Sequence, residues 1–133
     1  MILGTGIDLC EVERMRRLYE RFGERLLVRV FTDMERAEAL RRRDPAEGLA
    51  VRWAAKEAGT KALGTGFHQG VGWRDFEVVH EPSGRPTLRV AGRAAEIARE
   101  RWGRHRWHVS LTHERDYACA VAIAEDGDEE ETP

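Results

Sequence analysis

An alanine-rich segment with helical character, residues 47–63, constrains the fold of this chain more than any other feature. It contains the run Arg52-Trp53-Ala54-Ala55-Lys56-Glu57-Ala58-Gly59-Thr60-Lys61-Ala62-Leu63. Asp44-Pro45 precedes it, and the residue before a proline resists helical geometry. Gly64-Thr65-Gly66 follows it, and glycine adopts the left-handed conformation that ends many helices. We therefore predict one long helix over about residues 47–63.

The other expected elements alternate between strands and helices. Residues 2–7 are apolar and partly β-branched, which indicates a strand, and from Leu9 on apolar residues recur every three or four positions, which predicts a helix. Thr32 and Glu35 have capping-box spacing, which predicts a second helix over 33–43. Further strands are expected over 73–80, 87–90, 107–111 and 117–124, and a further helix over 93–102. This order predicts an α+β fold, a small antiparallel sheet packed on helices.

Length and composition indicate one domain in a reducing compartment. A chain of 133 residues fits a single domain, and no apolar run approaches the roughly 20 residues that cross a bilayer. The first residues have no basic segment of the kind that opens a secretion signal. Two cysteines, Cys10 and Cys119, make a poor disulfide framework. We expect a cytoplasmic protein with no membrane partner.

The charges are distributed unevenly. Residues 125–133 hold six acids and no base, so the remaining chain has 22 bases against 18 acids, a charge of +4. We predict a folded domain over 1–124 and an acidic, disordered tail over 125–133. Ten arginines against five acids lie between Arg14 and Arg43, and Arg14, Arg17 and Arg21 share one face of the first predicted helix. This face is either an ordinary solvated surface or a site for an acidic partner.

Asp8 is the first candidate site residue. It ends the run Gly4-Thr5-Gly6-Ile7-Asp8, where the first strand meets the first helix. One interpretation is an N-cap, with Glu11 three residues later closing a capping box. The other is an oxygen ligand for a cation, and local sequence alone leaves both open.

Two further clusters could contribute to chemistry. Glu57 and Lys61 lie one helical turn apart, which fits either a surface ion pair worth about 0.3–0.5 kcal/mol or a carboxylate and an ammonium that hold Mg²⁺ and polyphosphate. Thr112 and His113 combine a hydroxyl with an imidazole, which suits phosphate contact or proton transfer but also an ordinary polar loop. The sequence contains no phosphate-loop fingerprint and no Cys/His spacing of a structural zinc site.

The clusters, in this order, resemble one family. The matching motifs are Gly6-Ile7-Asp8 with Arg14, Trp53-Ala54-Ala55-Lys56-Glu57-Ala58 with Lys61-Ala62-Leu63-Gly64-Thr65-Gly66, Gly84-Arg85-Pro86, and Ser110-Leu111-Thr112-His113 with Tyr117-Ala118. Together they resemble the holo-acyl-carrier-protein synthases, which are small bacterial 4′-phosphopantetheinyl transferases. The resemblance spans residues 2–124 and implies the fold of that family.

The resemblance also implies a reaction and its residues. A serine of an acyl carrier protein would take the 4′-phosphopantetheine arm of coenzyme A in a Mg²⁺-dependent step that releases adenosine 3′,5′-bisphosphate. Asp8 and Glu57 would bind the metal, Glu57 is a candidate to accept the serine proton, and Lys61 would stabilise charge on the phosphates. Contacts to coenzyme A would come from Lys61, Gly64, Thr65, Arg85, Thr112 and His113. Arg85 replaces the lysine that the family often has in this turn.

The resemblance implies partners as well. Arg14, Arg17, Arg21 and Arg25 would face the acidic carrier protein, and small members of the family are homotrimers with shared active sites. The larger side chains of the last strand, Tyr117, Cys119, Val121 and Ile123, suit either such an interface or a core. Larger relatives have a second acid at the position of Cys10. Two alternatives are a non-catalytic carrier-binding module and a nucleic-acid-binding module that uses the basic helix, although no nucleic-acid fold signature appears.

Overall fold

A computed structural model describes residues 1–127 of the chain, and most of the predicted acidic tail, residues 128–133, lies outside the described residues. The elements along the chain are β1 (Ile2–Glu11), α1 (Val12–Phe22), α2 (Glu24–Val30), α3 (Asp33–Leu40), α4 (Pro45–Leu63), the short 3₁₀ helix η1 (Trp73–Asp75), β2 (Phe76–His80), β3 (Pro86–Val90), α5 (Gly92–Trp102), β4 (His105–His113) and β5 (Tyr117–Asp126). No helix among residues 1–127 is both long and apolar enough to cross a membrane.

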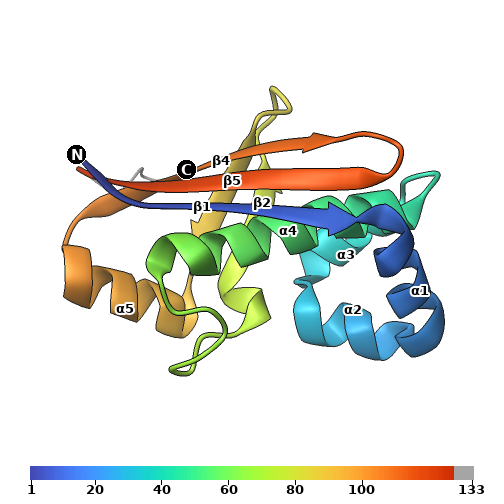
Figure 1. Ribbon diagram of the computed structural model, residues 1–133, viewed down its shortest axis with the longest axis horizontal. Helices are drawn as coiled ribbons and strands as arrows, with labels where there is room; N and C mark the ends of the chain where they lie inside the picture. Colours follow the sequence, from blue (N-terminus) through green and yellow to red (C-terminus); the bar gives the residue numbers. More distant parts are fainter. Residues whose placement is uncertain (128–133) are drawn as a thin grey trace.

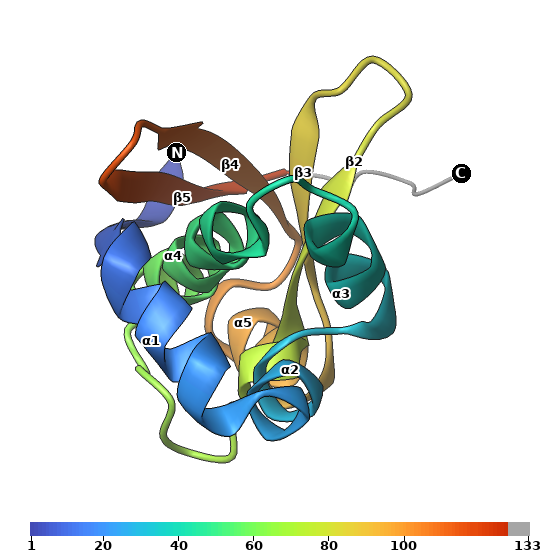
Figure 2. The same ribbon diagram turned by 90° about the vertical axis from the view of Figure 1, so that its right-hand side faces the viewer.

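The strands form two antiparallel sheets. Three strands pair in the order β1-β5-β4, and β2 pairs with β3 as a hairpin. The helices lie on one side of the three-stranded sheet, with α4 running along β1 and β5 (Figure 1). Within residues 1–127, no helix lies over the other face of this sheet (Figures 1 and 2). The predicted α+β architecture, a small antiparallel sheet packed on helices, is confirmed.

Small residues let β1 lie directly against the backbone of α4. A Cβ atom added to Gly4 would be 2.1 Å from the carbonyl oxygen of Ala62, and one added to Gly6 would be 2.0 Å from that of Ala58. On the neighbouring strand β5 the small side chains are the buried ones, namely Ala118, Ala120, Ala122 and Ala124. This close contact fixes the position of β1 relative to Glu57 and Lys61 of α4.

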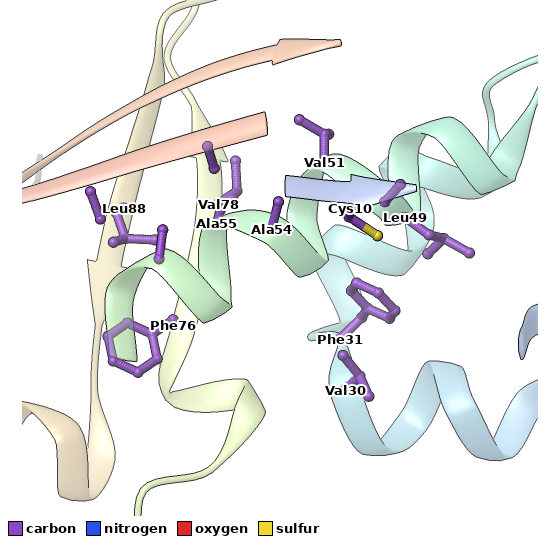
Figure 3. Close-up of a cluster of buried hydrophobic side chains, with 14 of the residues drawn as sticks. Cys10, Val30, Phe31, Leu49, Val51, Ala54, Ala55, Phe76, Val78 and Leu88 are labelled. Carbon is purple, nitrogen blue, oxygen red and sulfur yellow. The ribbon is translucent and has the colours of Figure 1, made fainter. Parts of the chain in front are cut away.

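A second part of the core lies between α4 and the remaining helices. Cys10 and Leu49 pack near Phe31 (Figure 3). The same buried cluster continues through the side chains of the β2–β3 hairpin, namely Phe76, Val78 and Leu88. Phe76 also lies against α4, where a Cβ atom on Gly59 would be 2.6 Å from its ring. The core therefore holds α4 from both sides, with the sheet on one face and α3 and β2 on the other.

The beginning of α1 differs from the prediction. The apolar period was expected to start a helix at Leu9, but β1 continues through Glu11, which pairs with Tyr117 of β5. Leu9 lies on the exposed outer face of the sheet, and the helix begins at Val12. Strand pairing with β5 outweighs the local helical period here, because Leu9 fits both patterns.

Other element boundaries also differ. Helix α2 was not predicted, α3 ends at Leu40 before the expected residue 43, and residues 73–75 form η1 where a strand was expected. Strand β5 continues to Asp126, so Glu125 and Asp126, which were assigned to the tail, belong to the sheet. Glu125 accepts hydrogen bonds from Arg106 and His108 of β4, which explains why the strand extends past residue 124.

Candidate active site

Asp8 lies on the face of β1 that packs on α4. Strand alternation places Gly6, Asp8 and Cys10 toward the helix and Ile7 toward the outer face. The Oδ1 atom of Asp8 lies 3.1 Å from Nζ of Lys61, and the same ammonium donates to the Ile7 carbonyl oxygen at 3.0 Å. The N-cap interpretation of Asp8 is wrong, because α1 begins four residues later at Val12, and its N-cap residue is Glu11, which makes no side-chain capping hydrogen bond. The carboxylate of Asp8 is therefore free of a capping role.

Glu57 lies one turn before Lys61 on α4 and is half-buried. Burial raises the pKa of the Glu57 carboxyl, the negative charge of Asp8 raises it further, and Lys61 and Arg14 partly oppose this. The structure thus brings the two predicted carboxylates into electrostatic range of each other. Two carboxylates that repel favour a cation between them. Their hard oxygen atoms are the ligands that Mg²⁺ uses, with water and phosphate completing its shell.

Cys10, the neighbour of Asp8 on the same face of β1, does not offer a third ligand of this kind. Its thiol is buried, and burial together with the charge of Asp8 raises the pKa of Cys10 to about 11. A thiol that stays protonated is a poor metal ligand. Within residues 1–127 no group of three or more His, Cys, Asp or Glu side chains could hold a metal ion.

Gly64 and Thr65 shape the turn that directly follows Lys61. Gly64 ends α4 in the left-handed conformation, with φ of 84°, and its amide donates to the carbonyl oxygen of Thr60. The Thr65 hydroxyl donates to the Gly66 carbonyl oxygen at 2.8 Å, and Thr65 is buried. Both residues lie beside the cationic end of the site, and their contact with coenzyme A remains a prediction.

The remaining predicted contact residues lie elsewhere. Arg85 is exposed in the turn of the β2–β3 hairpin, which projects from the body of the molecule (Figure 2). Thr112 and His113 end β4, and β5 separates that strand from β1 and Asp8. As consecutive strand residues they point to opposite faces, with Thr112 on the outer face beside Cys119. One chain therefore presents two groups, one around Asp8 and one along β4 and the hairpin.

The basic face begins next to the carboxylate pair. Arg14, Arg17 and Arg21 of α1 and Arg25 of α2 are all exposed. Arg21 and Arg25 both lie over the Phe22 ring, with guanidinium carbons 5.1 and 5.7 Å from its centroid. Since α1 starts where β1 ends, Arg14 is near enough to lower the pKa of Glu57. A partner on this face would be adjacent to the site.

Comparisons with known proteins identify the family of the chain. The family model of the 4′-phosphopantetheinyl transferase superfamily matches residues 4–122. A holo-acyl-carrier-protein synthase of Methylobacterium radiotolerans is 56% identical over 128 residues, covering 94% of each chain. One from Koribacter versatilis is 48% identical over 95% of this chain and 100% of its own. The chain belongs to the holo-acyl-carrier-protein synthase family.

Solved structures of this family have the same fold. The holo-acyl-carrier-protein synthase of Neisseria meningitidis has a TM-score of 0.83 at 35% identity, covering 95% of this chain and 100% of its own. That of Bacillus anthracis, in complex with coenzyme A (3′,5′-ADP), has a TM-score of 0.78 at 31% identity over 96% and 99% of the two chains. The family and fold expected from the motifs are thus confirmed.

The sequence did not indicate the structural role of Lys56, the residue of α4 that precedes Glu57. Lys56, next to Glu57, is fully buried, and its ammonium donates to Glu35 Oε1 at 2.6 Å and to the carbonyl oxygens of Trp73 and Phe76. The other oxygen of Glu35 accepts from the Val78 amide at 3.1 Å. The capping box predicted the N-terminus of α3 correctly, but nothing local indicates that the same glutamate anchors α4.

Proposed function

We propose that this chain transfers the 4′-phosphopantetheine arm of coenzyme A to a serine of an acyl carrier protein, with Mg²⁺ and with release of adenosine 3′,5′-bisphosphate. Membership of the holo-acyl-carrier-protein synthase family supports the transferase class, and the coenzyme A complex of the Bacillus anthracis relative supports the co-substrate. The observation that carries the proposal is that Asp8, Glu57 and Lys61 lie together where β1 packs against α4.

Each residue of this group has a role in the proposed reaction. Asp8 and Glu57 hold the metal, which would supply positive charge to the pyrophosphate oxygens. Lys61, anchored on β1, neutralises charge on the oxygen atoms of the leaving phosphate. Glu57 accepts the proton of the serine hydroxyl as the serine oxygen attacks the phosphorus that bears the arm.

We propose that a homotrimer completes the site. On the outer face of the three-stranded sheet, β1 carries the apolar residues Ile7 and Leu9, each 61% exposed, and no helix of residues 1–127 covers them (Figure 1). Ile7 pairs with Val121, so β5 continues the same apolar surface. An apolar patch of this kind is typical of an interface. Packing between subunits would let Arg85, Thr112 and His113 of one subunit face Asp8 of another, which a single chain does not do.

The proposed partner of the basic face is the carrier protein. Arg14, Arg17, Arg21 and Arg25 give an acidic, helical partner a complementary surface beside Glu57. A cytoplasmic location fits the two cysteines, which are both free thiols. The proposed domain ends with β5 at Asp126, and the predicted tail after residue 127 lies outside the described residues.

Mass spectrometry tests the transfer directly. An apo acyl carrier protein is incubated with this protein, coenzyme A and MgCl₂. The expected result is a mass gain equal to one phosphopantetheine arm, which is absent when EDTA replaces the metal. If the mass of the carrier protein stays unchanged in the presence of coenzyme A and MgCl₂, the proposed transfer is contradicted. A monomeric mass of this protein by light scattering would contradict the shared site.

A further inference from the structure

A carboxylate on the first turn of α4 contacts the imidazole at the end of β4. Oε1 of Glu47 lies 2.8 Å from Nδ1 of His113. Both side chains are partly exposed, Glu47 at 29% and His113 at 40%, so the contact lies at the surface and outside the core. Neither residue belongs to the group around Asp8. Nothing in the sequence motifs points to Glu47, because it precedes the matching part of the helix.

The surroundings of His113 make Glu47 its specific partner. Arg42, just before α4, reaches Glu47 Oε1 only at 4.0 Å. The turn after His113 contains Glu114, Arg115 and Asp116, which are exposed. Two of these make backbone contacts, Glu114 with Tyr117 and Asp116 with Val12. Within residues 1–127, the ionic contact of the His113 ring is the one with Glu47.

This contact determines which ring nitrogen is available. A carboxylate at Nδ1 fixes the orientation of an imidazole and keeps a proton on that nitrogen. The other nitrogen, Nε2, is then the one that can meet a ligand. We propose that Glu47 is a positioning residue that holds His113 with Nε2 toward a phosphate of bound coenzyme A. This inference rests on the proposed function, because it deepens the role of a predicted contact residue.

The chemistry suits a phosphate that does not react. When a bound phosphate draws a second proton onto the ring, the negative charge of Glu47 balances the imidazolium, and its Nε2–H can donate a charge-assisted hydrogen bond to a phosphate oxygen. A contact with a non-reacting phosphate stabilises the bound substrate and the transition state equally. Loss of the positioning contact is therefore expected to raise KM for coenzyme A and to leave kcat nearly unchanged.

Substitutions at Glu47 test this expectation. Glu47→Ala removes the acceptor and should raise KM for coenzyme A, and Kd by calorimetry, about fivefold, with kcat changed less than about twofold. Glu47→Gln keeps an acceptor oxygen without the charge and should have a smaller effect. The matched control is Glu114→Ala, which removes an exposed acid from the neighbouring turn and should leave both constants unchanged. In a His113→Gln background, Glu47→Ala should add nothing further.

An independent readout is the tautomer of His113. Two-bond ¹H–¹⁵N spectra report which nitrogen bears the proton, and His113→Gln assigns the signal among the five histidines. The neutral ring should have its proton on Nδ1 in the native chain and lose this preference in Glu47→Ala. A proton on Nε2 in the native chain, or an unchanged or lower Kd for coenzyme A in Glu47→Ala, would overturn the inference. If no arm is transferred but the Kd and tautomer change as expected, the proposed function fails and this inference stands.

Discussion

Lys61 of α4 donates to Asp8 of β1 at 3.1 Å, so a helix cation is anchored on the neighbouring strand. The same ammonium also donates to the Ile7 carbonyl oxygen. Its hydrogen bonds therefore go to β1 and not along the helix to Glu57. This removes the interpretation of Glu57 and Lys61 as an ordinary surface ion pair. Glu57 is left half-buried beside a second carboxylate, which is a costly arrangement unless a cation is bound.

Glu57→Gln should separate function from stability. It removes the proposed metal ligand and base, so transfer should fall at least about 100-fold. The free energy of unfolding at neutral pH should rise or stay the same, because the amide has no charge for burial and Asp8 to oppose. Rates come from carrier-protein mass spectrometry and stability from urea unfolding. Glu20→Gln, an exposed substitution on α1, is the control, and near-native transfer by Glu57→Gln would refute the role of Glu57.

The pH dependence of stability follows from the same carboxyl. The folded-state pKa of Glu57 lies above its ordinary value of 4.5, because of burial and then Asp8. The folded state thus holds the proton more tightly than the unfolded chain does. The contribution of Glu57 to the free energy of unfolding is therefore largest below pH 4.5 and declines as pH rises through the folded pKa.

Asp8→Asn should move the pKa of Glu57 down toward 4.5, since the negative charge of Asp8, which raises it, is removed. ¹³C NMR titration of the Glu57 carboxyl measures this directly. The Glu57 pKa should stay above 4.5 even in the variant, because burial is its first cause. An unchanged or higher pKa would show that the two carboxylates do not interact.

Gly6→Ala should damage both the fold and the site. The new methyl would be 2.0 Å from the Ala58 carbonyl oxygen, so β1 must move away from α4. We expect a loss of about 3 kcal/mol or more in the free energy of unfolding, and lower transfer because Asp8 moves with the strand. Gly72→Ala is a matched control, because its nearest contact would be at 4.0 Å. Equal stability of the two variants in urea would contradict the close strand–helix contact.

Local signals explain which elements the sequence predicts. The N-terminus of α3 follows from the capping box of Thr32 and Glu35, and the end of α4 follows from Gly64 in the left-handed conformation. Both depend on residues within a few positions of each other. The start of α1 was predicted wrongly because Leu9 fits a strand face as well as a helical period, and pairing with distant Cys119 decides between them.

The site can be predicted only in part, because its geometry also depends on contacts between residues that are distant in the chain. The family resemblance implies that Asp8 and Glu57 share one metal beside Lys61, but the geometry of their meeting depends on the close contact of Gly6 with Ala58. The partners of Lys56 and His113, Glu35 and Glu47, are distant in the chain. Their pairing results from the packing of α3 and β4 against α4, which no local pattern encodes.

The buried Lys56–Glu35 pair should be costly to break from one side. Lys56→Met leaves the Glu35 carboxylate buried without its cation, and we expect a loss of about 3–5 kcal/mol in the free energy of unfolding. Lys56→Met with Glu35→Gln should recover part of this loss, because the buried charge is gone. Glu96→Gln at the exposed Arg93 pair of α5 is the control and should have little effect. Additive losses in the double variant would contradict coupling of the two side chains.

Charge reversal on the basic face should weaken carrier binding specifically. Arg17→Glu and Arg21→Glu place a negative charge on exposed positions of α1, where an acidic partner would be repelled. Each should raise KM for the carrier protein about five- to tenfold and reduce its dependence on salt, with KM for coenzyme A unchanged. Arg41→Glu, an exposed reversal that follows α3, is the matched control. If Arg41→Glu raises the carrier KM as much as the α1 variants do, the effect comes from net charge and the docking face is wrong.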